Sequence, residues 1–534
     1  MQSLTGLLQA DPAPLPDDAG RRRIALQLGE ALGLTIYANS VSFARGSCFA
    51  LGRVGVEKRL VAVAEQAERL AGFEGTVGEL TLPGGTLHCC IGPASPENAR
   101  LLRERLPFLR PQVLGLAKSI GCGDRLGLAT PGHVDALRRV AEEAHHTMSL
   151  IAAQQSVREN ARTGRTPQQV LDDAMWGIFE AGWRAGYGAD ADHLKTPDDV
   201  APWVEAGFTF YTIDPGDHVD DGAELGSAAA LREKVAALPW DVLESDPDDL
   251  LRRFRAPVDI GTELVTMDEM QILRAAAKYG HAVAHTVTMY RHIRDAMGGR
   301  PFELEVSVDE TATVTRVEEH IYIATELRRL GVEWVSLAPR YVGSFEKGVD
   351  YIGDPGKFRA DFARHAAVAK AFGPYKLSLH SGSDKFTVYP IAAEVAGELV
   401  HLKTAGTSYL EALRTVAHVE PDLFREILGF AKQRYGTDRA SYHVSGEPGR
   451  VPDPGRVEAG ELPGLIDRFD TRQVLHVTFG SVLQNDGFKE RLYDVLRRHE
   501  DLHYEMISRH FVRHIRPFVL GAAGSAAGRV DAGV

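Results

Sequence analysis

The sequence predicts an α/β protein built on a closed (β/α)8 barrel of the TIM type. From about residue 118 onwards, short apolar runs that end in Gly, Asp, His or Ser alternate with segments that carry apolar residues at helical spacing. Alternating strands and helices indicate parallel βαβ units, and about eight such units close a barrel. The runs lie at residues 119–133, 185–199, 208–220, 302–311, 332–343, 375–385, 399–406 and 474–484.

The positions of these runs predict the domain organisation. Residues 1–110 are expected to form a small N-terminal α+β domain, and residues 111–520 the barrel. An unusually long spacer predicts an insertion at about 221–300, on the loop after the third run. The tail at 521–534 is rich in Gly and Ala and is expected to be disordered.

Local patterns predict individual elements within these domains. In the N-terminal domain we expect a helix over 57–70 and a turn between two strands at the Pro-Gly-Gly of 83–85. The insertion is expected to contain a long helix over 268–297. Helix-period spacers between barrel strands lie at 131–161, 197–207, 317–331, 357–372 and 409–435.

Composition excludes several classes of protein. The 534 residues carry a net charge of -13, which argues against a surface for nucleic acid or for an anionic membrane. Four cysteines without a CxxC pair fit a reducing compartment, and no apolar run reaches about 18 residues. We therefore expect a cytoplasmic enzyme without a membrane partner, and a homo-oligomer remains open.

Histidines follow three of the predicted strands, where a parallel barrel collects its active-site residues. His193 and His401 each begin the tetrapeptide HLKT, and His380 ends the run KLSLH. Imidazoles beside carboxylates bind Zn, Mn, Co or Ni, so these three histidines are candidate ligands of a divalent metal. The alternative is that the HLKT histidines are core residues beside solvated lysines.

Carboxylates near the same strand ends supply candidate proton-transfer groups. Asp192 adjoins His193, and Glu305 lies inside the otherwise apolar strand FELEVSVD, where a charged side chain is seldom unpaired. We expect these two residues to form a catalytic acid and base pair. A structural ion pair of Glu305 with Lys or Arg is the competing interpretation, and Asp309 and Glu310 could equally cap the helix that follows.

Cations near the strand ends predict an anionic ligand such as a sugar carboxylate or phosphate, because the protein as a whole is acidic. There is no P-loop and no GxGxxG after a strand. Solvated charge is the alternative for any single residue. The candidate substrate-binding residues are Lys195, Arg340, Lys347, Lys385 and Lys403, with Asp124 and Arg125 from the segment GDRLGLATPGH.

Long segments of the chain resemble the tagaturonate/fructuronate epimerase family. They are GDRLGLATPGH, ADADHLKT, FELEVSVDETATVTRVEEHIYIATEL, VSLAPRYVGSFEKGVDYIGD, LSLHSGSDKFTVYP and VHLKTAGTSYLEAL, and they extend from about residue 119 to 410. The resemblance implies a metal-dependent epimerase that interconverts D-tagaturonate and D-fructuronate. It implies Asp192 and Glu305 as proton acceptor and donor, and His193 and His380 as metal ligands, with His401 or Glu346 completing the shell.

The implied reaction restricts the chemistry. The carbon to be inverted lies β to the ketone, so enolisation next to the carbonyl cannot invert it. A retro-aldol route can, whereas two proton shifts or a transient oxidation are alternatives, the latter normally requiring a nicotinamide site. A metal-dependent aldolase or isomerase of a related sugar acid or ketohexose would use the same groups, and a non-catalytic sugar-acid sensor would keep the barrel and its cations.

Overall fold

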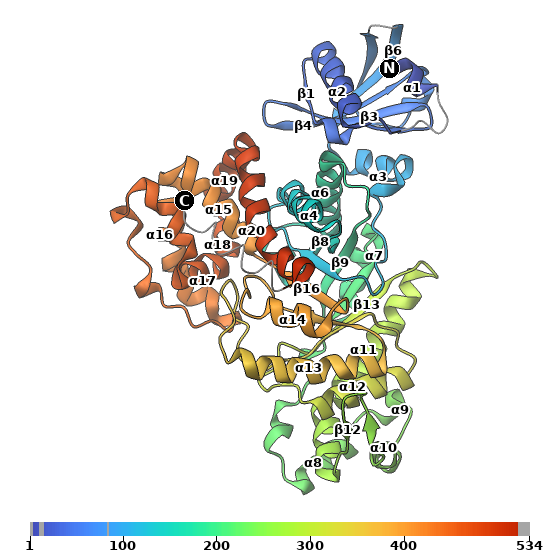
Figure 1. Cartoon of the computed structure of the whole chain (residues 1–534), viewed down its shortest axis with the longest axis vertical. Coiled ribbons are helices and arrows are strands. Elements are labelled where there is room, and N and C mark those ends of the chain that lie inside the picture. Colours follow the sequence, from blue (N-terminus) through green and yellow to red (C-terminus); the bar gives the residue numbers. More distant parts are fainter. Residues whose placement is uncertain (1–3, 10–14, 83–84, 522–534) are drawn as a thin grey trace.

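A computed structural model describes residues 4–9, 15–82 and 85–521 and confirms the predicted barrel. Eight parallel strands close in the order β10-β13-β14-β15-β16-β7-β8-β9. The closing pair, β16 and β7, joins segments that are far apart in the sequence (Figure 1). The strands are β7 (Ser119–Cys122), β8 (Ser149–Ser156), β9 (Gly188–Leu194), β10 (Phe210–Ile213), β13 (Glu303–Ser307), β14 (Ser336–Ala338), β15 (Lys376–Leu379) and β16 (Val400–Thr404).

One strand assigned from the sequence is wrong and one strand was not assigned, so the predicted number of strands is nevertheless correct. The run at 474–484 is helical and forms the end of α17 (Phe469–Val477) and α18 (Phe479–Leu483). The true remaining strand is β8, which lies inside the spacer predicted to be helical. Residues 471–480 are buried on every side, so their sequence has no amphipathic period that would reveal a helix.

The N-terminal region is a six-stranded antiparallel sheet, drawn in blue at one end of the molecule in Figure 1. The helix predicted over 57–70 is wrong, because Glu57–Ala64 is strand β4 and pairs with β3 and β6. The predicted turn at 83–85 falls largely outside the described residues, which omit 83 and 84. The other elements are β1 (Thr35–Ile36), β2 (Ser42–Ala44), β3 (Ser47–Val54), β5 (Thr76–Leu82), β6 (Gly85–Pro93), α1 (Leu4–Leu8), α2 (Asp18–Leu32) and α3 (Pro96–Arg105).

Helices surround the barrel between successive strands. The predicted helix over 268–297 is confirmed as α11 (Glu269–Met297), which begins at an Asp268 cap that accepts from Gln271 N. Before it lie the short elements of the predicted insertion, α8 (Ala228–Ala236), α9 (Trp240–Leu243), α10 (Pro247–Phe254), β11 (Val258–Asp259) and β12 (Leu264–Val265). The remaining helices of the barrel are α4 (Thr130–Ala144), α5 (Val157–Thr163), α6 (Pro167–Ala181), α7 (Val200–Ala206), α12 (Val317–Arg329), α13 (Pro355–Phe372), α14 (Tyr389–Ala396) and α15 (Thr407–Val419).

The C-terminal part of the chain is a helical layer on one flank of the barrel, in orange and red in Figure 1. It comprises α16 (Pro421–Asp438), α17, α18, α19 (Asp486–Arg498) and α20 (Glu500–Leu520). Helix α20 returns to the barrel and packs beside α4, where Ser508 Oγ donates to Asp135 Oδ2 at 2.6 Å. The predicted disordered tail lies outside the described residues except for Gly521. Among the described helices, none combines the length and the hydropathy of a membrane span.

A buried histidine pair between α12 and α13 makes stability dependent on pH. His320 Nδ1 lies 2.9 Å from His365 Nδ1, and Tyr375 Oη lies 2.7 Å from His320 Nε2. Burial lowers the pKa of His365 to about 4 and holds the pKa of His320 well below its ordinary value. Both imidazoles are therefore neutral in the folded protein at neutral pH.

Acidification should destabilise the protein through this pair. Between the unfolded-state pKa of about 6.5 and the folded-state value, the unfolded chain binds more protons, so the free energy of unfolding falls as pH drops. We expect a loss of up to about 1.4 kcal/mol per pH unit for each such group. Urea titrations of H365Q between pH 7 and 4.5 should give a shallower slope than wild type, whereas H292Q, an exposed control on α11, should not. Parallel slopes for wild type and H365Q would contradict this account.

Candidate metal centre and barrel-mouth pocket

A pocket lies where the sequence places the chemistry, at the carboxyl ends of the barrel strands. It spans about 360 Å³ of space, part of which is open solvent. Five of the predicted site residues line it together: Asp192, His193, Lys347, His380 and Lys403. Its other lining residues are Gln154, Gly348, Ser381, Ser383 and Ala405.

The floor of the pocket is a buried cluster of carboxylates around Lys403. The Lys403 ammonium lies 2.7 Å from Asp190 Oδ2, 3.1 Å from Glu305 Oε1 and within hydrogen-bond distance of Asp192 Oδ1. Thr212 Oγ1 accepts from Lys403 at 2.8 Å and donates to Asp190 Oδ1 at 2.9 Å. The predicted cation is therefore enclosed by the protein's own acceptors, and the competing ion-pair interpretation of Glu305 agrees with this geometry.

Charges in this cluster fix the protonation states. Burial raises the pKa of Asp192, but His193 and Lys403 outweigh it and hold the pKa well below its usual range. Burial likewise opposes ionisation of Glu305, yet Lys403 and His380 lower its pKa strongly. Asp190 differs, because burial raises its pKa to about 7 despite the contact with Lys403. Both Asp192 and Glu305 are thus carboxylates at neutral pH and are able to accept protons.

Each pocket histidine is paired with one of these carboxylates. His193 Nδ1 lies 2.7 Å from Asp192 Oδ1, and His380 Nε2 lies 2.6 Å from Glu305 Oε1. Such carboxylate contacts fix the orientation of an imidazole and leave its other nitrogen available to a ligand. The second nitrogen of His193 is Nε2, and the second nitrogen of His380, Nδ1, lies 3.2 Å from both Ser307 Oγ and Asp309 Oδ1. The two ring centroids are 5.1 Å apart.

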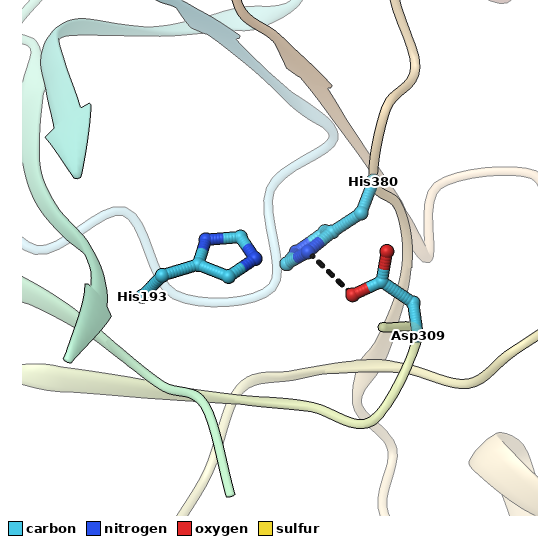
Figure 2. A group of neighbouring side chains, drawn as sticks. All are labelled: His193, Asp309 and His380. Carbon is cyan, nitrogen blue, oxygen red and sulfur yellow. Dashed lines mark ion pairs between the residues drawn. The ribbon is translucent and has the colours of Figure 1, made fainter. Parts of the chain in front are cut away.

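Asp309 completes a group of possible metal ligands with these two histidines. One ligand atom from each of His193, Asp309 and His380 lies within 4.8 Å of the other two, and His380 Nδ1 is 3.2 Å from Asp309 Oδ1. Figure 2 shows the three side chains converging from different strand ends. Two imidazoles and one carboxylate suit a borderline divalent cation such as Zn, Mn, Co or Ni, so the donor set fits the predicted metal.

A β-bulge explains why two consecutive residues, Asp192 and His193, both reach the pocket. The pairing of β10 with β9 shifts register between Tyr211 and Ile213, so β9 has an additional residue at this point. His193 adopts a left-handed backbone conformation with φ +53°. In a regular strand, neighbouring side chains would point to opposite faces.

The second HLKT segment lies in a regular strand, and its histidine occupies a different position. His401 is fully buried one layer below the pocket, where its Nδ1 lies 2.9 Å from Ser119 Oγ and its ring packs near Phe210. Burial lowers the pKa of His401 to about 3. The structure does not bring His401 to the group formed by His193, Asp309 and His380. We therefore omit it from the candidate ligands.

Several other predicted residues serve the fold in this structure. Asp124 accepts from three main-chain N–H groups of its own loop, including Ala129 N at 2.7 Å. Arg125 pairs with Glu159, and Glu346 accepts from Ser445 and from Gln473. These charged side chains are occupied by internal partners, which leaves no role for Glu346 in the candidate metal shell.

The remaining predicted cations are divided between the surface, the interior and the pocket. Lys195 is 42% exposed and pairs with Asp217 at 3.0 Å. Lys385 is fully buried away from solvent. Within the described part of the chain, Arg340 and Lys347 form no ion pair, and only Lys347 lines the pocket, donating from Nζ to Ser381 Oγ at 2.6 Å. Lys347 is thus the cation best placed to meet an anionic ligand.

Three residues of this site received no individual role from the sequence, although Asp190 and Asp309 are carboxylates at predicted strand ends. Asp190 precedes Asp192 by two positions on the same strand face, a spacing that could have identified it. Asp309 was considered as a helix cap, and its position directly after FELEVSV carried the better signal. Ser381 could be found only from the structure, because its contact with Lys347 depends on the path of two loops.

A second group, Asp384, His510 and His514, also brings possible ligand atoms together, but hydrogen bonds occupy them. His510 Nε2 is 2.6 Å from Asp384 Oδ1. His514 Nε2 accepts from Asp384 N at 3.0 Å, and His514 Nδ1 lies 3.0 Å from His510 O. This group is a polar connection between α20 and the loop after β15.

Comparisons with known proteins identify the family of this chain. The sequence pattern of a family described as tagaturonate epimerase matches residues 37–518. A tagaturonate/fructuronate epimerase of Thermotoga maritima is 45% identical over 419 residues, which are 78% of this chain and 84% of that protein. A native crystal structure of a fructuronate-tagaturonate epimerase from Cohnella laeviribosi has a TM-score of 0.84 at 33% identity, covering 93% of this chain and 99% of its own. The same enzyme with two glycerol molecules gives 0.84 at 32% identity, covering 94% of this chain and 99% of its own.

Proposed function

This chain belongs to the tagaturonate epimerase family, as its motifs indicate, and on that premise we propose that it interconverts D-tagaturonate and D-fructuronate in the barrel-mouth pocket. The observation that carries the proposal is the convergence of His193, Asp309 and His380 beside two ionised carboxylates. A lone carboxylate or histidine would fit many proteins, whereas this combination supplies both charge stabilisation and proton transfer.

His193, Asp309 and His380 would hold a divalent cation. When bound, the cation would stabilise negative charge that develops on substrate oxygens. Asp192 and Glu305 orient the two imidazoles, and their lowered pKa values keep both carboxylates ionised, which is the form that can accept a proton. These residues therefore have two roles in the proposal, orientation and proton transfer.

The proposed reaction is a retro-aldol cleavage followed by re-addition. One carboxylate takes the proton of the hydroxyl on the carbon β to the ketone. The bond between that carbon and the α carbon breaks, and its electron pair forms an enediolate with the ketone carbon. The aldehyde rotates, the enediolate attacks its other face, and the protonated carboxylate returns a proton to the new alkoxide. In each direction the carboxylate that takes the hydroxyl proton, Asp192 or Glu305, is the one that returns it, which is consistent with microscopic reversibility.

Lys347 is the proposed contact for the substrate carboxylate. Its ammonium lies in the pocket wall, makes no ion pair within the described residues and is fixed by Ser381. Lys403 is unsuited to this role because its donors face Asp190, Asp192, Glu305 and Thr212. In this proposal the two lysines have different partners: Lys347 binds the substrate carboxylate, and Lys403 binds the carboxylates of the protein.

The conversion of tagaturonate, followed with and without EDTA and in D2O, tests the activity and the retro-aldol route. Purified protein should convert tagaturonate into fructuronate, lose this activity in EDTA and recover it with one divalent ion. In D2O the inverted carbon should acquire no deuterium, because its C–H bond is never broken in a retro-aldol route. Obligatory deuterium at that carbon would contradict the route but not the activity. Net release of three-carbon fragments would instead indicate an aldolase, and indifference to EDTA would contradict metal dependence.

The variant Glu305→Gln tests whether Glu305 transfers a proton or binds the metal. The amide cannot accept the substrate proton, so we expect turnover to fall about 100-fold or more. Metal content should remain near that of wild type, because Glu305 is not in the proposed ligand group and contacts only the far nitrogen, Nε2, of the ligand His380. Loss of the metal in E305Q would place this carboxylate among the ligands.

A further inference from the structure

Two loops at the carboxyl end of the barrel share the wall of the pocket. The loop after β14 contributes Lys347 and Gly348, and the loop after β15 contributes Ser381 and Ser383. The hydrogen bond from Lys347 Nζ to Ser381 Oγ joins them directly. Ser381 has φ +47°, a left-handed conformation that costs free energy in a residue other than glycine and persists only where the surroundings enforce it.

Lys385 connects the two loops from beneath the pocket wall. Its Nζ donates to the carbonyl oxygens of Glu346, at 2.8 Å, and Val349, both in the loop after β14. A third donation, at 2.9 Å, goes to Ser383 O in its own loop. An ammonium has three N–H donors, and all three are used. Because the side chain is fully buried, Lys385 cannot bind the substrate as the sequence predicted.

Arg472 makes the same connection from outside the barrel. It lies on α17, and its Nε donates to Gly348 O at 2.6 Å. Its Nη2 donates to Asp384 Oδ2 at 2.7 Å in the loop after β15. The other oxygen of Asp384 contacts His510 from α20, so α17 and α20 both support this loop.

We propose that Lys385 and Arg472 are positioning residues that hold Lys347 beside Ser381 in the pocket. The inference rests on the proposed function, in which Lys347 binds the substrate carboxylate. Two buried cations from different parts of the chain fix the main-chain oxygens on both sides of Lys347, namely Glu346 O and Gly348 O. This arrangement limits the freedom of a long side chain whose ammonium must meet a carboxylate at a set distance. The helical layer outside the barrel is thereby part of the substrate-binding apparatus.

Lys385 and Arg472, with the main-chain oxygens that they hold, are called the clamp below. A double-mutant cycle tests whether the clamp acts through Lys347. We expect K385M to raise KM for tagaturonate about tenfold while kcat and metal content change little. In the K347M background, K385M should raise KM no further, because the residue being positioned is already gone. K370M, an exposed lysine on α13, is the matched control. An equal rise in KM in both backgrounds would overturn the proposal.

Hydrogen exchange supplies a measurement that does not require activity. K385M should increase amide exchange in residues 343–350 and 381–385, whereas K347M should leave both loops protected. R472K, which keeps the charge but loses the planar fork, should show the same increase in milder form if K385M does not fold. Unchanged exchange in K385M or R472K would refute the clamp. A wild-type protein that lacks epimerase activity would refute the proposed function, and the exchange result would still decide whether the clamp exists.

Discussion

Replacing His380 with alanine is expected to remove the bound divalent metal and to lower kcat for tagaturonate by about 1000-fold or more. His380 offers Nδ1 to the ligand group with His193 and Asp309, and its Nε2 is the partner of Glu305. The substitution therefore removes a proposed ligand and releases the carboxylate proposed to transfer protons. Metal analysis of the purified variant alongside steady-state kinetics measures both effects.

Two other histidines provide controls for His380→Ala. H292A alters an exposed side chain on α11 and should retain both metal and turnover. H401N tests the geometry more severely, because the sequence made His401 a candidate ligand and the structure places it beside Ser119. The variant should keep its metal. Full metal in H380A, or metal lost from H401N alone, would contradict the assignment of the centre.

Lys403→Met is expected to destabilise the protein by about 3–5 kcal/mol, as is typical when one partner of a buried ion pair is removed. The ammonium is 4% exposed and faces Asp190, Asp192 and Glu305. Its loss leaves Asp190 without its cation, and leaves Asp192 and Glu305 with only the imidazoles of His193 and His380. Their pKa values should rise in the folded variant. Because the folded variant then binds more protons than the unfolded chain, the deficit should shrink as pH falls towards 5.

The first HLKT segment supplies the control for Lys403→Met. Lys195 occupies the same place in the tetrapeptide but is 42% exposed and pairs with Asp217 on the surface, so K195M should cost less than about 1 kcal/mol. Denaturant titration of both variants at pH 5 and 8 measures the difference. Equal losses, or a Lys403 deficit independent of pH, would show that Lys403 does not balance the carboxylate cluster.

The barrel could be predicted from the sequence because seven of its strands combine an apolar run with an abrupt polar end. Strand β8 was not predicted, because SLIAAQQS contains Ala and Gln, which favour helices, and only one β-branched residue. Its burial on both faces between β7 and β9 overrides that local preference. The error was hidden because a fully buried helix at 474–484 resembled a strand and restored the count to eight.

The sequence predicted many of the residues of the site but not how they are arranged. Asp192 and His193 lie at the end of β9 and Lys403 at the end of β16, whereas His380 and Lys347 follow β15 and β14. Their convergence requires only that parallel strands end at one rim. The sequence could not show which side chain of each HLKT segment faces the pocket. A bulge in β9 turns His193 into the pocket, whereas the regular strand β16 places Lys403 there. Burial, which makes Lys385 a structural cation, likewise depends on loops whose path no local pattern encodes.

The closing pair of strands, β16 and β7, has a consequence for how the chain folds. Lys403 arrives on the last barrel strand, after Asp190, Asp192 and Glu305 have already been synthesised. Until β16 docks, these carboxylates can remain ionised only in contact with water, which opposes collapse of the barrel floor. Docking of β16 completes the backbone pairing and brings one positive charge to three carboxylates, and its long sequence separation from β7 favours slow pairing. We therefore expect closure of the barrel to depend on the same lysine that offsets the charge of the finished site.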